Sequence, residues 1–472
     1  MLLCFNYIMF VKHYYVMEFI NRTDELERIN QLRTKKESTL LVLYGRRRIG
    51  KTRLLQQVIN VDDIHFIADQ SETPLQIEAF AKIVGRHIAG FDTAIYPDWE
   101  SCFLTLNERL RKKITIIIDE FPYLVKNAPE LPSILQKLFD NRSELSFHLF
   151  LCGSSQQMMQ NLVVDSTSPL YGRANEIIKL LPMNIYWLKE ALNCSWTEAV
   201  EEYCIWGGVP RYWDLRIQEQ GMKAAVIKHI LDRNGVLHEE PVRLFLDDSR
   251  DTVQMSTLIT IISSGVHRLS EIASRIGKPA THLNRPLQRL IDLGYLKREI
   301  PYGTSPRKAK RTLYKVTDPF IHFYFRYVVP DKTSLELGLA EMIFNEVVVP
   351  GFSEYCSGFW EDICRASIPL LFRDKLFSPG SRWWSGSRPE NQTEIDIVSS
   401  SKDGSEMIVA EVKWATSVNI ASVCNDLSRK TTAIPGAKDK KIRKVLFLKN
   451  RPDYIPKGYS VFTAEEVITA YQ

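Results

Sequence analysis

Short apolar runs followed by segments with helical spacing recur in the first third of the chain. TLLVLYGRRRIGKTRLL (residues 39–55) predicts a buried strand, a turn and a helix. ITIIIDEFPYL (114–124) begins with an unbroken β-branched run, as a strand buried on both faces does, and SFHLFLCGSS (146–155) predicts a third strand. Such strands alternating with helices predict an α/β fold class with a parallel sheet.

The pattern changes to short helices between residues 251 and 316. One helix is expected to have Ser270 as its cap and to end at Gly277, and the next has four leucines on one face (residues 283–293). KREIPYGTSPRKAKRTLYKV (297–316) then predicts a two-stranded hairpin. Helices followed by such a hairpin indicate a winged helix-turn-helix.

The last quarter of the chain returns to an α/β pattern, in which the strands EIDIV and MIVAEVKW follow a long helical segment. If these strands close about Asp403 and Gly404 as a two-residue turn, Asp396 falls directly opposite Glu411. Lys413 lies two residues beyond Glu411. The strand period of two therefore places its side chain on the same face.

Composition limits the functions that these elements can serve. The chain has 472 residues, 45% of them hydrophobic and 25% charged, with a formal net charge of +5. Any nucleic-acid surface therefore needs local clustering of Lys and Arg. Eight cysteines without a C-x-x-C pair argue against a zinc site or a disulfide framework and favour the cytoplasm. The apolar residues 1–16 are too few to span a membrane, and translation is expected to begin at Met17.

The pattern G-x-x-x-x-G-K-T predicts a phosphate-binding loop. Its two glycines, Gly45 and Gly50, let backbone N–H groups wrap phosphates, Lys51 would reach the terminal phosphates, and the Thr52 hydroxyl would hold Mg²⁺. The residues between the glycines belong to the same expected nucleotide site: Arg46, Arg47, Arg48 and Ile49. ATP and Mg²⁺ are the expected cofactors.

Polar side chains end the two strands that follow. Asp119 and Glu120 end the second, where in phosphoryl-transfer enzymes one acid holds the magnesium shell and the next polarises the attacking water. Ser154 and Ser155 end the third strand, where a small polar group can sense the terminal phosphate. We therefore expect Asp119 and Ser154 to contact the nucleotide and its metal, and Glu120 to act in catalysis.

Six segments in order resemble the archaeal-type ATPases of the STAND and AAA+ group: FINRTDELERI, GRRRIGKT, IIIDEFPYL, LCGSS, SPLYGR and WGGVP. The resemblance implies a P-loop ATPase in which the arginine of Y-G-R, Arg173, completes the γ-phosphate site. An exposed arginine at a helix start is the alternative. It also implies that the stretch 207–210 lets a helical lid face the nucleotide, where the alternative is a plain interhelical turn.

Basic residues cluster in and beside the predicted hairpin: Lys297, Arg298, Arg307, Lys308, Lys310 and Arg311. Such a cluster suits contact with DNA phosphates, so DNA is the expected partner. The alternative is a solvated loop on a winged helix that acts as a spacer or lid. The aromatic-rich segment 316–328 is expected to be a buried helix rather than a surface for base stacking.

The carboxylates of Asp396 and Glu411 suit a hard divalent cation such as Mg²⁺, and Lys413 would orient or activate the attacking water. The spacing D-x14-E-x-K resembles the PD-(D/E)xK nuclease superfamily, although the proline of that name is missing here. The resemblance implies a restriction-endonuclease-like domain in which Glu361 is an additional metal ligand. A charged surface hairpin is the alternative, but these charges interrupt apolar strands, where they need a reason.

These resemblances imply four domains. They are a P-loop ATPase core (17–180), a helical lid (181–250), a winged helix-turn-helix (251–330) and a nuclease-like α/β domain (345–472). The region from 345 onward also resembles the uncharacterised domain that follows archaeal-type ATPases.

Three hypotheses for function follow. The first is a cytoplasmic ATP-binding and ATP-hydrolysing switch, coupled to a DNA-facing winged helix and a metal-dependent nuclease domain. The second is an ATP-dependent DNA-binding regulator or scaffold with an inactive nuclease fold. The third is a nucleotide-binding chaperone without DNA contact. A homo-oligomer in which Arg173 acts between subunits and a monomer both fit the sequence.

Overall fold

The computed structural model describes residues 17–163, 165–248, 251–305, 309, 311–385 and 393–472. The chain divides into two compact units. The first consists of Met1–Pro182, Val209–Arg211 and Leu244–Arg250, and the second contains the remaining residues. The segments expected as winged helix and nuclease-like domain therefore lie in one compact unit, as does most of the expected lid.

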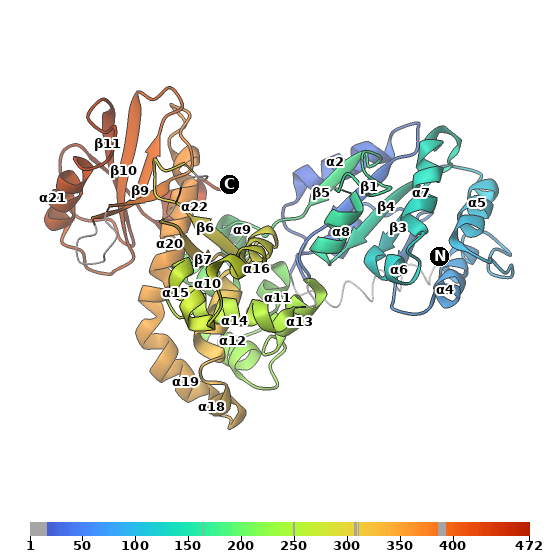
Figure 1. Cartoon of the computed structure of the whole chain (residues 1–472), viewed down its shortest axis with the longest axis horizontal. Helices are drawn as coiled ribbons and strands as arrows, with labels where there is room; N and C mark the ends of the chain where they lie inside the picture. Colours follow the sequence, from blue (N-terminus) through green and yellow to red (C-terminus); the bar gives the residue numbers. More distant parts are fainter. Residues whose placement is uncertain (1–16, 164, 249–250, 306–308, 310, 386–392) are drawn as a thin grey trace. The chain divides into compact units, whose positions relative to one another are not determined.

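A five-stranded parallel sheet in the order β2-β3-β4-β1-β5 forms the centre of the first unit (Figure 1). Its strands are β1 (Leu40–Tyr44), β2 (Ile64–Ile67), β3 (Ile114–Asp119), β4 (Phe147–Gly153) and β5 (Glu176–Lys179). All side chains of β1, β3 and β4 are buried, as their continuous apolar sequences predicted. The expected α/β architecture with a parallel sheet is confirmed for this unit.

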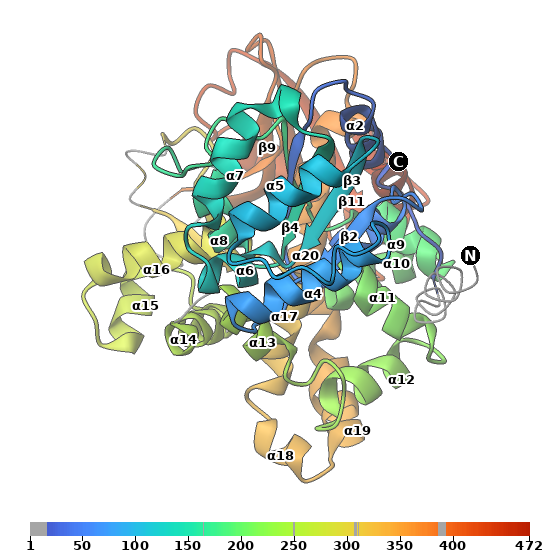
Figure 2. The same cartoon turned by 90° about the vertical axis from the view of Figure 1, so that its right-hand side faces the viewer.

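Helices pack against this sheet and complete its core. They are α2 (Thr23–Arg33), α3 (Lys51–Gln56), α4 (Thr73–Gly85), α5 (Trp99–Arg109), α6 (Phe121–Asn127), α7 (Leu131–Asp140) and α8 (Gln156–Val163). α4 packs on β2, and α5 lies between α4 and α7 (Figure 2). There Phe80 lies against Trp99 with ring centroids 5.6 Å apart, and Trp99 stacks on Phe103 at 5.7 Å.

Short helices begin the second unit. They are α9 (Ile185–Leu192), α10 (Trp196–Trp206), α11 (Pro210–Ile217), α12 (Met222–Val226) with a π-helical turn at Ile227–Leu231, and α13 (Glu240–Asp248), of which α11 and α13 run partly in the first unit. Three more follow, α14 (Thr252–Ser263), α15 (Leu269–Ile276) and α16 (Ala280–Asp292), and then the antiparallel strands β6 (Leu296–Glu299) and β7 (Leu313–Val316).

The predicted end of α15 is correct, because Gly277 adopts the left-handed conformation that closes a helix. The predicted cap is wrong. The helix begins at Leu269, so Arg268 occupies the cap position and Ser270 lies inside the first turn.

The aromatic-rich segment forms α17 (Pro319–Phe323) and a π-helical turn at Tyr324–Val328. Phe320, Ile321 and Phe323 are buried, which confirms the expected buried helix. The chain continues through α18 (Lys332–Glu336), α19 (Ala340–Ile343), a π-helical turn at Phe344–Val348 and the long helix α20 (Val349–Leu371).

A second five-stranded sheet, in the order β12-β11-β10-β9-β8, follows α20. Its strands are β8 (Ser381–Trp384), β9 (Glu394–Ser400), β10 (Glu406–Lys413), β11 (Lys441–Leu448) and β12 (Tyr459–Phe462), with α21 (Ile420–Thr431) before β11 and α22 (Ala464–Thr469) at the end. β8, β9 and β10 are antiparallel, whereas β10, β11 and β12 are parallel. A separate α/β part with a mixed sheet is therefore present in the last quarter.

Buried charges join the β6–β7 hairpin to α20. The Glu299 carboxylate lies 3.0 Å from Lys297 Nζ, 3.2 Å from Lys315 Nζ and 3.3 Å from Arg365 Nη1. Burial opposes the charged carboxylate, but these three cations outweigh it and hold the pKa of Glu299 well below its ordinary value. Beyond β6, the Tyr302 N–H donates to the Arg382 carbonyl at 2.9 Å. The hairpin is thus anchored on the part of the unit that contains the second sheet.

Replacing Glu299 with Gln should lower the free energy of unfolding by about 3 kcal/mol at pH 7, because the buried Arg365 and the partly buried Lys297 and Lys315 would lose their shared carboxylate. A carboxylate whose pKa is lowered by folding stabilises the fold at pH values above its pKa in the unfolded chain, and this contribution is lost as the pH falls. The difference in the free energy of unfolding between the native protein and Glu299→Gln should therefore shrink toward pH 3. Urea unfolding measures both. Glu271→Gln, at an exposed position of α15, is the control. Equal stability of Glu299→Gln and the native protein would contradict this anchor.

Candidate functional site

The phosphate loop connects β1 to α3, and its backbone requires glycine at two positions. Gly50 has φ 97° and ψ 20°, the left-handed region that favours glycine. At Gly45 a Cβ atom would lie 2.5 Å from the carbonyl oxygen of Leu180, which no side chain tolerates. The backbone conformation therefore favours glycine at position 50, and close packing requires glycine at position 45.

The Lys51 side chain is 5% exposed and folds back over the loop. Its Nζ donates to the carbonyl oxygens of Gly45 at 2.9 Å and Arg46 at 3.1 Å, and to the Ser154 hydroxyl at 3.0 Å. An ammonium held by neutral oxygens can exchange them for the stronger charge-assisted bonds of a phosphate.

The ends of β3 and α3 meet through a hydrogen bond between two predicted metal ligands. The Thr52 hydroxyl donates to Asp119 Oδ2 at 2.6 Å, and Asp119 Oδ1 accepts from the backbone N–H of Glu120 at 2.9 Å. A hydroxyl and a carboxylate at this distance are oxygen ligands of the kind that Mg²⁺ takes. The residues present therefore fit a magnesium ion beside the phosphate loop.

The Glu120 side chain is held by Ser154, the residue that follows the neighbouring strand β4. The Glu120 backbone is in the left-handed region, with φ 54° and ψ 40°, which is uncommon outside glycine and typical of functional positions. Its two carboxylate oxygens accept from the Ser154 hydroxyl at 2.6 Å and the Ser154 N–H at 3.1 Å. A continuous chain of hydrogen bonds therefore runs from Lys51 through Ser154 to Glu120.

The other residues predicted for the nucleotide site differ in how exposed their side chains are. In the loop, the side chains of Arg46 and Ile49 are buried and Arg47 is exposed, while Arg48 is partly exposed with φ 65°. Arg173 donates through Nε to Asp140 at 3.0 Å, outside the hydrogen-bond chain of Lys51. Its part in a γ-phosphate site stays a prediction.

Gly207 in the predicted lid motif has a packing role within the second unit. Its φ is 56°, and a Cβ there would lie 3.1 Å from Pro319 of α17. Its carbonyl accepts from the indole N–H of Trp213 at 2.8 Å. The expected position of this motif near the nucleotide stays a prediction.

The β9–β10 hairpin has the predicted register. Ile397 pairs with Ala410, and continuing this pairing by one residue puts Asp396 opposite Glu411. The predicted two-residue turn is wrong, because Ser401 pairs with Glu406 and four residues close the hairpin. The register survives because both loops are centred between Asp403 and Gly404.

Asp396, Glu411 and Lys413 come together as predicted. Lys413 Nζ lies 2.9 Å from Glu411 Oε2 and 3.5 Å from Asp396 Oδ2. Asp396 is 8% exposed and Glu411 is 4% exposed. Asp396 Oδ2 also accepts from the Val412 N–H at 2.8 Å, so the two strands hold it directly.

Two basic residues of this site were not predicted. Lys430 on α21 donates to Glu411 Oε1 at 3.0 Å. Arg365 on α20 donates through Nε to the Asp396 carbonyl at 2.9 Å and through Nη2 to Glu361 at 2.7 Å. The i,i+4 spacing of Glu361 and Arg365 was a usable signal for that pair. No sequence pattern connects Lys430 to a strand nineteen residues earlier.

Two glutamates of this site have a raised pKa. Burial raises the pKa of Glu411 and that of Glu361, and the Asp396 carboxylate raises both further. Burial works against the charged form of Lys413, but Asp396 and Glu411 outweigh it and raise its pKa. A divalent cation would relieve the repulsion between these acids.

Two oxygen-bearing acids held by adjacent strands fit part of a magnesium shell. Among the described residues, no group of three or more His, Cys, Asp or Glu side chains is arranged to hold a metal ion. The role of Glu361 as a third ligand, in particular, stays a prediction.

The predicted basic cluster at the hairpin is partly neutralised. Lys297 pairs with Glu299 and with Asp362. Arg298 and Arg311 are exposed. Three other members of the cluster lie outside the described residues: Arg307, Lys308 and Lys310.

The first unit thus has a parallel sheet whose first strand leads into a phosphate loop and whose third ends in paired acids, which defines a P-loop nucleotide-binding fold. Residues 19–213 match a family described as an ATPase domain predominantly from Archaea. The chain therefore carries an ATPase domain of the archaeal P-loop type. Residues 324–425 match a family described as archaeal and bacterial proteins of unknown function.

Uncharacterized protein MJECL04 of Methanocaldococcus jannaschii is 29% identical over 433 residues, which cover 88% of this chain and 92% of that protein. The Walker-type ATPase PABY2304 of Pyrococcus abyssi is similar in structure, with a TM-score of 0.49 at 19% identity over 65% of this chain and 96% of that one. The ORC2 protein of Aeropyrum pernix in its ADPNP-ADP complexes has a TM-score of 0.45 at 13% identity over 69% and 97%. Within the described part of the chain, no helix has the length and apolar character needed to cross a membrane.

Two glutamates of β10 should respond to substitution in opposite ways. A carboxylate with a raised pKa loses stability as the pH rises, so Glu411→Gln should raise the melting temperature at pH 7.5, and this gain should shrink toward pH 4.5. A hydrogen bond from Arg443 lowers the pKa of Glu406, so Glu406→Gln should lower the melting temperature at pH 7.5. Thermal unfolding at the two pH values measures both. A loss of stability in Glu411→Gln at pH 7.5 would show that Glu411 serves an ordinary ion pair.

Proposed function

We propose that this chain binds ATP with magnesium at the phosphate loop and hydrolyses it. The observation that supports this most strongly is the hydrogen-bond chain from Lys51 through Ser154 to Glu120, beside the bond between Thr52 and Asp119. It joins a phosphate-binding cation to the acid that would act on water. Hydrolysis needs these two groups to be positioned around one γ-phosphate.

In this proposal each residue has one task. Lys51 leaves its carbonyl partners and donates to the terminal phosphates, while the loop backbone donates to the others. Bound Mg²⁺ would neutralise charge on the phosphoryl oxygens. Ser154, no longer engaged by Lys51, continues to orient Glu120, whose carboxylate accepts a proton from the attacking water.

Lys51→Ala should reduce ATP hydrolysis about 100-fold, because the phosphoryl group would lose a preorganised cationic donor. Ser154→Ala should reduce kcat about tenfold and leave KM nearly unchanged, because it frees Glu120 without removing a phosphate-binding cation. Steady-state phosphate release measures both. Ser133→Ala, at an exposed position of α7, is the control and should keep the native rate. Hydrolysis at the native rate in Lys51→Ala would contradict the proposal.

A second candidate function concerns Asp396, Glu411 and Lys413. We propose that they form a magnesium-dependent site that cleaves phosphodiester bonds of DNA. The support is that two buried acids, which carry charge of the same sign, share a lysine on one face of a hairpin. Lys413 would donate to the scissile phosphate or orient water. Arg365 would hold the backbone of Asp396 in place.

The alternative is a DNA-binding regulator with an inactive site, because lysines already neutralise Glu411 from two sides. Binding of a divalent ion separates the two functions. In an active site, Glu411 would give up its contacts with the two lysines when the ion binds. In a structural ion-pair cluster, Glu411 would keep these contacts and no ion would bind. Coupling of either function to ATP is part of the proposal, and its support is that both sites lie in one chain.

Asp396→Asn should abolish plasmid nicking in Mg²⁺ or Mn²⁺, with a loss of at least about 100-fold, because it removes one charge from a two-acid site. Agarose gels of supercoiled plasmid measure the nicked and linear forms. Asp374→Asn is the control, because Asp374 is exposed and pairs with Arg443 outside this site. If the native protein hydrolyses ATP but does not cleave the plasmid, the result would favour the DNA-binding regulator with an inactive site.

A further inference from the structure

A cavity of about 530 Å³ lies within the second unit, between the β6–β7 hairpin, the starts of α15 and α16, and the end of β8. Arg298 of β6, Arg311 before β7 and Arg268 before α15 contribute to its wall. Trp384, the last residue of β8 and 4% exposed, also belongs to the lining. The volume falls in the range of about 300–1,000 Å³ that small-molecule sites occupy.

The charged side chains that line this cavity are all arginines, one of which, Arg268, also lies 3.9 Å from Glu271 of α15. Its described lining contains three arginines and no aspartate or glutamate. Ser270, Asn284 and Thr312 add side-chain hydrogen-bond donors. Arginine presents several N–H donors in a planar fork that matches phosphate oxygens, so this lining suits a phosphate better than a carbonyl or an apolar ligand.

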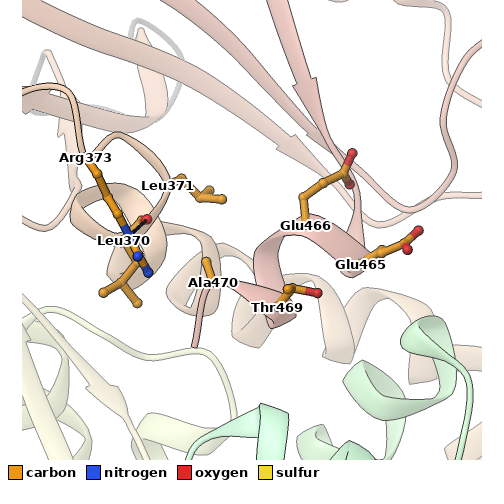
Figure 3. Close-up of a pocket in the computed structure, with 7 residues that line it drawn as sticks. All are labelled: Leu370, Leu371, Arg373, Glu465, Glu466, Thr469 and Ala470. Atoms are coloured by element: carbon orange, nitrogen blue, oxygen red, sulfur yellow. Dashed lines mark hydrogen bonds between the residues drawn. The ribbon is translucent and has the colours of Figure 1, made fainter. Parts of the chain in front are cut away.

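Another hollow of the second unit provides a comparison. It measures about 710 Å³ and lies between the end of α20 and α22 (Figure 3). Arg373 lines it together with Glu465 and Glu466, so an anion there would meet two negative charges. Size alone therefore does not make an anion site, and the charge of the lining distinguishes the two cavities.

The backbone at the arginine-lined cavity favours the same ligand. The first turns of α15 and α16 contribute Leu269, Ser270 and Ala280 to the lining. The N–H groups of a first helical turn have no partner within their helix, and the helix dipole makes this end positive. Two helix starts thus reinforce the charge of the three arginines.

We propose that this cavity binds a phosphodiester group of a nucleotide chain, with Arg298 and Arg311 donating to the phosphate oxygens and Trp384 bordering the adjoining sugar or base. The proposal gives the expected DNA contact a defined place, to which Arg268 and Trp384 contribute in addition to the basic hairpin. It requires neither ATP hydrolysis nor the acids of β9 and β10.

The test measures binding of a fluorescein-labelled 12-nucleotide single-stranded DNA by anisotropy, in EDTA and without ATP, so that neither proposed activity affects the result. Arg298→Gln and Arg311→Gln should each weaken binding about tenfold and reduce the salt slope by about one. Arg373→Gln, in the cavity of mixed charge, should bind like the native protein. Circular dichroism and a native melting temperature confirm that each variant is folded.

Competition by the dinucleotide pTpT identifies the source of the phosphate. If pTpT displaces the labelled DNA from the native protein and fails to do so in Arg298→Gln, the cavity accepts a short free nucleotide. If only the longer strand binds and the same variants weaken it, the ligand is the backbone of a polymer. Both results support the site. Native-like DNA affinity in Arg298→Gln and Arg311→Gln would overturn it, as would the absence of DNA binding by the native protein.

Discussion

The parallel pairing of β4 with both β1 and β3 is the constraint on which the candidate ATP site depends. Tyr44 of β1 lies beside Gly153 of β4, and Ile118 of β3 lies beside Leu151. The next residues of all three strands therefore leave the sheet at one edge. The phosphate loop, the acids after β3 and Ser154 meet there because the strands share a direction, although they are far apart in sequence.

The second unit places its charges by a different rule. An antiparallel hairpin determines which residues face each other, and its register puts Asp396 opposite Glu411 without a contribution from loop length. These acids are buried, so the fold surrounds them with Lys413, Lys430 and Arg365. A carboxylate whose pKa remains raised despite such neighbours is poorly placed for stability alone. The same unit keeps three arginines together at a cavity without a described acid, so its positive charge is local rather than general.

Sequence patterns predicted what periodicity and motif spacing can encode. They identified three of the five strands of the first sheet (β1, β3 and β4), the phosphate loop and the hairpin register that brings Asp396 to Glu411. They did not predict that Leu180 packs on Gly45, that Lys430 reaches Glu411, or that Glu299 anchors the hairpin to α20, because these contacts depend on tertiary packing between distant segments. The error at Ser270 has a local cause, since a serine can sit within a first turn as well as before it. The role of Arg173 in a γ-phosphate site stays a prediction, and in this structure its guanidinium pairs with Asp140.

The central claim is that Thr52 and Asp119 make the phosphate loop a site for ATP together with magnesium. The most direct test is the affinity for ATP by calorimetry, with Mg²⁺ and with EDTA, in the native protein and in Asp119→Asn. The account predicts that Mg²⁺ tightens binding at least about tenfold in the native protein, and that this dependence is largely lost in the variant, which keeps its affinity in EDTA. An affinity that is independent of Mg²⁺ in the native protein would contradict the account.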